Sequence, residues 1–175
     1  MGYRDIVHNS QVIRALRELE RHGIYGKLYK VRQNYGVILF DVVATGNYIM
    51  KEMKRKYVTS SYDQTNRTIT FHIEIPEYEA KGEPKELRDE TAKDLQDRLR
   101  RKGITSYVEI PDDRNAYVVI DLDSVAKYMA KHVSRALRGN VNAYVYYDRE
   151  NAVVQAHVWT GETPEEVKRL KGGEA

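Results

Sequence analysis

The sequence predicts an α+β fold built as a tandem duplication of one αββαββ unit. Three features predict it: an internal repeat, β-rich runs paired across short polar turns, and amphipathic helices that end at glycine. Each unit is expected to form a four-stranded antiparallel sheet with helices on one face, and the two units are expected to be related by a pseudo-twofold axis. The expected boundaries are 1–78 for the first unit, 79–85 for a linker, and 86–175 for the second unit with a short C-terminal helix.

The repeat is visible as identical residues at two constant spacings. Pairs 80 positions apart include Gly23 and Gly103, Asp41 and Asp121, Tyr48 and Tyr128, Lys51 and Lys131, and Arg55 and Arg135. Pairs 85 positions apart include Asp63 and Asp148, Asn66 and Asn151, and His72 and His157. The change in spacing indicates one insertion between a predicted helix and a strand, where added loop length costs little.

In the first unit, apolar residues from Val12 to Leu19 recur at helical spacing, and Gly23 ends the predicted helix. The runs 24–31 and 35–43 are β-rich and are joined by a short polar turn, which is typical of a hairpin. A second, shorter helix is expected from Tyr48 to Tyr57.

The unit closes with a second hairpin, whose strands are expected at 58–63 and 68–75. The last strand alternates, so that Ile69, Phe71 and Ile73 point to one side and the polar residues between them to the other. One face of the sheet is therefore expected to be apolar and the other polar.

The second unit repeats this order. A helix is expected over 86–102, a hairpin over 104–110 and 116–122, a helix from Ser124 to Leu137, and a hairpin over 143–147 and 152–160. Thr163 and Pro164 together indicate the start of a short final helix.

Composition excludes several classes of function. The 175 residues contain no cysteine, which rules out disulfides and thiolate chemistry and favours a cytoplasmic location. No apolar stretch approaches the length of a membrane helix, so no membrane partner is expected. The formal net charge is only +3, so any affinity for nucleic acid depends on where the 29 Lys and Arg residues lie. The charge-rich, cysteine-free composition favours a thermophilic source.

Basic residues recur on the second helix of both units, and 14 of the 17 aromatic residues are tyrosines. Basic helix faces can hold phosphates, and tyrosine or histidine on an open sheet face can stack on bases. A solvated helix face and hydrogen-bonded strand histidines would give the same pattern. The candidate nucleic-acid-binding residues are Lys27, Tyr29, Arg32, Lys51, Arg55, His72, Tyr107, Lys127, Lys131, Arg135 and His157. No metal ligands, catalytic residues or cofactor motifs are assigned.

The duplicated order of helices and hairpins resembles the LAGLIDADG homing endonucleases. In that family the first helix of each unit ends in an acidic, metal-binding residue just before a glycine. Here the glycines are Gly23 and Gly103, but His22 and Lys102 stand at the metal positions. A protonated lysine is not a ligand for a hard cation. The resemblance therefore implies the fold without metal-dependent cleavage.

These features together favour a non-catalytic nucleic-acid-binding protein, with DNA favoured over RNA, as a degenerate relative of that family. Two alternatives stay open: a protein–protein interaction or assembly module of a cytosolic complex, and a metal-dependent nuclease. The chain is expected to be a monomer with internal pseudo-symmetry or a homodimer, and to need no cofactor.

Overall fold

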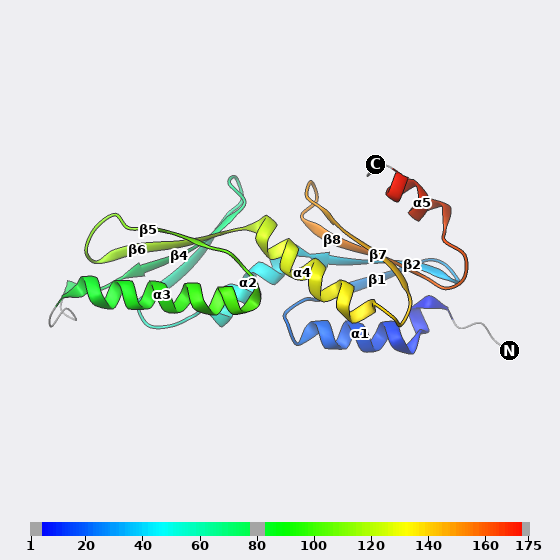
Figure 1. The fold of residues 1–175 in the computed structure, drawn as a ribbon, viewed down its shortest axis with the longest axis horizontal. Coiled ribbons are helices and arrows are strands. Elements are labelled where there is room, and N and C mark those ends of the chain that lie inside the picture. The colour runs from blue at the N-terminus through cyan, green and yellow to red at the C-terminus, as the bar shows by residue number, and fades with distance from the viewer. Residues whose placement is uncertain (1–4, 78–82, 173–175) are drawn as a thin grey trace. The chain divides into compact units, whose positions relative to one another are not determined.

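The computed structural model describes residues 5–77 and 83–172. Figure 1 shows the helices and strands along the chain. The helices are η1 (Ile6–His8, a 3-10 turn), α1 (Ser10–Glu20), α2 (Val42–Glu52), α3 (Pro84–Lys102), α4 (Leu122–Leu137) and α5 (Glu165–Gly172). The strands are β1 (Gly26–Arg32), β2 (Tyr35–Asp41), β3 (Val58–Asp63), β4 (Thr68–Glu74), β5 (Tyr107–Glu109), β6 (Asn115–Asp121), β7 (Asn142–Asp148) and β8 (Val153–Trp159).

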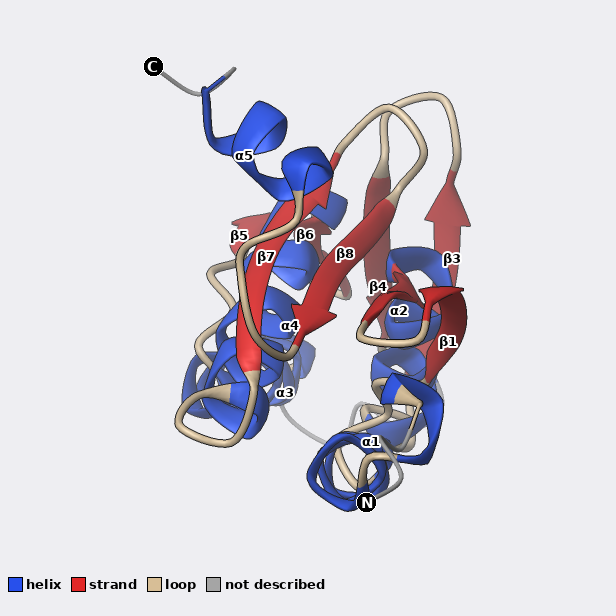
Figure 2. Ribbon diagram, turned by 90° about the vertical axis from the view of Figure 1, so that its right-hand side faces the viewer, coloured by secondary structure: helices blue, strands red, loops and turns tan. Residues whose placement is uncertain are grey.

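The strands form two four-stranded antiparallel sheets. Sheet A has the order β1-β2-β8-β7, and Figure 2 shows β7 beside β8 within it. Sheet B has the order β3-β4-β6-β5. The predicted α+β class and the two four-stranded sheets are therefore confirmed.

The composition of the sheets differs from the expectation. Each sheet combines one hairpin from the first half of the sequence with one from the second half, whereas we expected both hairpins of a half to pair with each other. The chain leaves sheet A after β2 and enters sheet B through α2, and it returns through α4. The sequence does not reveal this exchange, because hairpins of both halves show the same alternation and either could complete a sheet.

The described chain accordingly divides into two compact units that are not the halves of the sequence. Unit 1 comprises residues 1–45 and 129–175, and unit 2 comprises residues 46–128. The expected linker 79–85 lies mostly outside the described residues. Its last two residues, Pro84 and Lys85, begin α3, which suits the fixed backbone of proline in a first helical turn.

Several local features recur at the predicted spacings. Ile24 donates its N–H to the Leu19 carbonyl at 3.1 Å, and Ile104 donates to Leu99 at 3.0 Å, after Gly23 and Gly103 with φ of 74° and 88°. Only glycine adopts this left-handed backbone without strain, which confirms the predicted helix ends.

The hairpin turns after β3 and after β7 also match each other. The Asn66 amide donates to the Asp63 carboxylate at 2.7 Å, and Asn151 donates to Asp148 at 2.7 Å. The strand orders correspond as well when β1 and β2 are matched with β5 and β6, and β8 and β7 with β4 and β3.

Both second helices begin earlier than expected, directly after a strand. Asp41 ends β2, and its carboxylate accepts the N–H groups of Val43 and Ala44 at 2.9 and 3.2 Å. An aspartate in this position satisfies free donors of the first turn. In the second half, α4 likewise begins at Leu122 directly after β6, so Ser124 lies inside the helix.

The main core of each unit lies on one side of its sheet. In sheet B the buried residues of β4 are Ile69, Phe71 and Ile73, which confirms the predicted alternation. Leu95 and Leu99 of α3 are buried in the same unit, and α3 contacts β6 and β4. The opposite face of each sheet is called its outer face below.

Candidate nucleic-acid interface

The outer face of sheet A is rich in aromatic side chains. The strand register places its residues in rows that cross the four strands. The rows begin with Asp41, Val153 and Asp148. They continue with Lys27, Leu39, Gln155 and Tyr146, then Tyr29, Val37, His157 and Tyr144, and end with Tyr35, Trp159 and Asn142. We call this surface the aromatic face.

A chain of hydrogen bonds fixes the side chains in the middle of the aromatic face. The Tyr35 hydroxyl lies 2.7 Å from His157 Nδ1, and His157 Nε2 lies 3.2 Å from Gln155 Oε1. The Tyr146 hydroxyl donates to the same Gln155 oxygen at 2.8 Å. Since Gln155 Oε1 can only accept, His157 carries its proton on Nε2 and accepts the Tyr35 hydroxyl proton at Nδ1.

The surroundings of His157 favour this neutral form. The side chain is buried, and burial lowers the pKa of His157 below its ordinary value, because the charged ring loses its hydration. Burial also raises the pKa of Tyr35, so the hydroxyl stays protonated and donates. Both ring nitrogens of His157 are engaged, which gives this predicted contact residue a positioning role for the tyrosines around it.

The C-terminal helix α5 covers one end of the aromatic face. Val167 is buried against Tyr35 and Trp159, and Val37 and Tyr144 pack against this cluster. Lys171 Nζ lies 5.7 Å from the centre of the Tyr144 ring and 5.9 Å from that of Trp159, within the range of cation–π attraction. The expectation that helices lie on one face only is therefore wrong for sheet A. The sequence predicted the helix but not its place, since Val167 alone does not specify which apolar surface it covers.

Arg32 is held at the covered end. Its guanidinium donates two hydrogen bonds to the Glu166 carboxylate, at 2.7 and 2.9 Å, and lies 5.0 Å from the Tyr35 ring centre. The hydrogen bonds from Arg32 lower the pKa of Glu166 to about 2. This predicted phosphate contact is thus already paired with a carboxylate.

The other end of the aromatic face is not covered by α5. Tyr29 is 46% exposed, which leaves one side of its ring open to a stacking partner. Lys27 is exposed, and its Nζ lies 5.8 Å from the Tyr29 ring centre. A cation beside an open aromatic ring can bind a phosphate while the ring stacks on the neighbouring base.

The outer face of sheet B is acidic, whereas the strands of sheet A place Lys27 and Arg32 as well as Asp41 and Asp148 on the outer side. The outward positions of the strands of sheet B include four carboxylates, from Asp63, Glu74, Glu109 and Asp121. No outward position in these strands, all of which are described, holds Lys or Arg. Two predicted contact residues, His72 and Tyr107, lie on this acidic face. Phosphate groups are repelled by such a surface.

His72 is tied into the turn that precedes β6. Its Nε2 lies 2.9 Å from Asn115 Oδ1, and its ring stacks on Tyr117 with 4.6 Å between centres. Asp112 accepts both the backbone N–H and the side-chain amide of Asn115 at 2.9 Å, and these bonds lower the pKa of Asp112.

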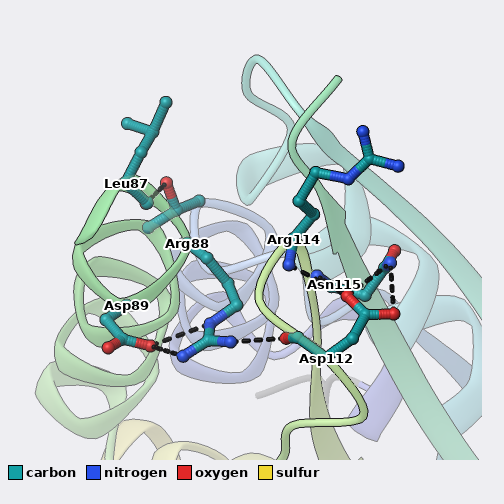
Figure 3. A network of polar contacts seen from close by, with 7 residues as sticks. Leu87, Arg88, Asp89, Asp112, Arg114 and Asn115 are labelled. Atoms are coloured by element: carbon teal, nitrogen blue, oxygen red, sulfur yellow. Dashed lines mark hydrogen bonds and ion pairs between the residues drawn. The ribbon is translucent and has the colours of Figure 1, made fainter. Parts of the chain in front are cut away.

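Figure 3 shows this turn beside the start of α3. Buried Arg88 donates to the Asp112 carbonyl and, at 2.9 and 2.7 Å, to the Asp89 carboxylate. These contacts hold the turn in place. Since Asn115 of this turn binds His72, we assign His72 a structural role.

The remaining predicted residues lie on helices of both units. Lys51 and Lys127 are exposed in unit 2, while Lys131 and Arg135 are exposed on the part of α4 that belongs to unit 1. Arg55 forms an ion pair with Asp94 of α3. The predicted set is thus divided between the units and does not form one surface within either.

The positions that the LAGLIDADG resemblance assigns to metal have other contacts. The His22 ring lies 4.5 Å from that of His132, and Lys102 Nζ lies 2.8 Å from Glu52 Oε1. The Lys102 pair is ionic without hydrogen-bond geometry, since Glu52 Oε1 has no hydrogen-bond partner. Among residues 5–77 and 83–172 there is no cluster of three or more His, Asp or Glu side chains suited to a metal ion.

Sequence reasoning missed Tyr144, Tyr146 and Lys171 as parts of the aromatic face. Tyrosines two positions apart in a strand share one face, so Tyr144 and Tyr146 could have been assigned together. Lys171 could not, because its contacts depend on where α5 packs.

Charge is distributed unequally between the units. Unit 1 contains 14 Lys and Arg residues against 10 Asp and Glu, while unit 2 contains 15 against 16. Unit 1 therefore carries a formal charge of +4 and unit 2 of −1, so the net basic charge lies in the unit with the aromatic face.

Comparison with protein-family models, with curated proteins and with solved structures finds no match to this chain. In the described part of the chain, no helix combines the length and apolar character needed to cross a membrane.

Proposed function

We propose that the protein binds nucleic acid without catalysis, and that the uncovered end of the aromatic face is the binding site. The observation that carries this proposal is the pairing of exposed Tyr29 with Lys27 on the outer face of the more basic unit. A base stacked on Tyr29 would extend over Leu39 and Val37, which are half-buried in the adjacent strand.

The energetics favour a single strand as the ligand. Stacking of a base on an aromatic side chain contributes about 1–3 kcal/mol, and it requires a base that is free of its partner. Phosphate contacts by lysine add a contribution that weakens with salt. His157 would act by holding Tyr35 and, through Gln155, Tyr146 in place.

We further propose that the chain is the product of a duplication and a degenerate relative of the LAGLIDADG endonucleases. The matched helix ends, hairpin turns and strand orders support a duplication. DNA is the first ligand to test on this view, with RNA as the second. We propose a cytoplasmic location and either a monomer or a homodimer, in line with the absence of cysteine.

Fluorescence titrations with single-stranded DNA, single-stranded RNA and duplex DNA at two salt concentrations test the proposal. We expect binding that weakens as salt rises, and a loss of about tenfold in affinity for Tyr29→Ala. Tyr107→Ala is the matched control, since Tyr107 is a tyrosine of similar exposure, 49%, on the acidic face of sheet B. Absence of binding at low salt, or equal losses for the two variants, would refute the proposal.

A further inference from the structure

A groove follows the free edge of sheet B, between α2 and β3. It has a volume of about 640 Å³ and is lined by the second half of α2 and by residues 58–62 of β3. In sheet B, β3 is an edge strand that pairs with β4 alone. Such an edge is a template for a further strand.

The register shows which backbone groups of β3 face the groove. Glu74 donates its N–H to the Tyr57 carbonyl at 3.0 Å, and hydrogen-bonded pairs alternate from there along the antiparallel ladder. Ser61 therefore points its N–H and C=O toward β4. Ser60 and Tyr62 point theirs toward the free edge, where an added strand could pair with both.

The groove combines an apolar floor with basic side chains. Half-buried Met50, together with the buried side chains Met53 and Phe71, forms the floor, and Lys51 of α2 and Lys54 just after α2 supply the charge. No carboxylate lines the groove, and neither lysine forms an ion pair with a described residue. The groove is therefore complementary to a segment that carries both apolar and acidic side chains.

Ser60 is the residue that leaves this space open. It pairs with buried Phe71, which places its side chain on the helix-facing side of the sheet, yet Ser60 is exposed. The corresponding pair in sheet A is Val145 and Ala156, each 85 positions later. The edge of sheet B therefore has the small residue Ser60 where the corresponding edge of sheet A has Val145. The substitution Ser60→Val would fill the groove with the residue found in sheet A.

We propose that the groove binds an extended, acidic peptide segment of another protein, which adds a strand to β3. Its backbone would pair with Ser60 and Tyr62. Alternate side chains would enter the groove, with an apolar one on half-buried Met50 and carboxylates beside Lys51 and Lys54. This inference does not rest on nucleic-acid binding, because it concerns a different unit and different residues.

NMR titration of the ¹⁵N-labelled full chain tests this proposal. The probe is the capped peptide Glu-Thr-Val-Thr-Glu-Thr, whose alternate residues present Glu, Val and Glu to the groove. We expect the amide signals of Ser60 and Tyr62 to shift on addition of the peptide. A peptide with Lys in place of both Glu residues should bind about tenfold more weakly or worse, since two exposed charge contacts are lost.

Two double variants distinguish binding in the groove from a general effect of the charge of the protein. The double variant Lys51→Glu, Lys54→Glu should weaken binding about tenfold, whereas Lys85→Glu, Lys93→Glu, with the same charge change on exposed residues of α3, should not. Ser60→Val should reduce binding while preserving the rest of the spectrum. Equal affinity for the acidic and basic peptides, or shifts away from β3, would overturn the proposal. Self-association through Ser60 and Tyr62 without peptide would also overturn it, by assigning the edge to a second copy.

Discussion

The two units share their local construction but differ in the chemistry of their outer faces. Helix ends and hairpin turns match between them, whereas sheet A presents tyrosines with both basic and acidic side chains and sheet B presents carboxylates without Lys or Arg. A helix covers part of the first face, through Val167. Positions 80 apart illustrate the difference: Lys27 and Tyr29 correspond to Tyr107 and Glu109. Residues that fix the fold are thus repeated, whereas the outward residues of β1 and β5 are not.

The largest expected effects concern stability and should be similar in both units. Phe40 and Phe71 are fully buried, in sheets A and B respectively. We expect Phe40→Ala and Phe71→Ala each to lower the free energy of unfolding by about 3–5 kcal/mol, because each leaves a cavity in a packed core. Urea unfolding followed by circular dichroism measures this. A loss below about 1 kcal/mol in one unit only would mean that the cores are not equivalent.

The next largest loss of stability should come from a glycine in β1, and it should occur in unit 1 only. A Cβ atom at Gly26 would lie 2.8 Å from both Ile38 and Leu16 and would also meet Phe40, so Gly26→Ala overpacks the core of unit 1. We expect a loss of about 1–3 kcal/mol in thermal unfolding experiments. The position 80 residues later is Ser106, where an alanine should have little effect. Similar losses at both positions would contradict the packing described for β1.

His157 should give unit 1 a dependence on pH. Its folded pKa lies below the unfolded value of 6.5, so the unfolded chain takes up a proton first as pH falls. The contribution of neutral His157 to the free energy of unfolding is complete above pH 6.5. It is lost as pH falls toward the folded pKa, with a slope of at most about 1.4 kcal/mol per pH unit. His157→Gln should remove this part of the slope in urea unfolding experiments between pH 7 and 5. An unchanged slope would mean that another group titrates there.

The smallest effect should come from the ion pair at the covered end of the aromatic face. Glu166→Gln removes the negative charge opposite Arg32, so we expect nucleic-acid affinity to rise a few-fold as Arg32 becomes available to phosphate. Glu165→Gln, at an exposed neighbouring position, is the control. In the wild type the pair should stabilise α5 above pH 4.5 and lose its effect as pH falls toward 2, the pKa of Glu166. Lower affinity in Glu166→Gln would show that α5 supports the site.

The sequence predicted what depends on neighbouring residues. Alternation in β4 and the glycines after α1 and α3 were confirmed, because period and backbone conformation are local properties. The partners of each hairpin were not predictable, since every hairpin offers the same apolar face. The covered end of the aromatic face was not predictable either, because it depends on the packing of Val167 onto residues more than a hundred positions earlier.

For the predicted site residues, too, the sequence predicted local properties but not the packing partners. Lys27 and Tyr29 were both predicted to contact nucleic acid, and the register places them on one face of sheet A. His72 and His157 occupy corresponding positions in the repeat, yet they lie in different sheets with different partners. The position of a residue in the repeat specifies its strand and its face of the sheet. Its hydrogen-bond partners depend on the neighbouring strands.

The central claim is that nucleic acid binds the aromatic face of unit 1 and not the acidic face of unit 2. An NMR titration of the labelled full chain with a short thymidine oligonucleotide tests it most directly. We expect the largest shifts at Lys27, Tyr29 and Tyr146, and none at His72 or Tyr107. Shifts centred on His72 and Tyr107, or no shifts at low salt, would contradict it.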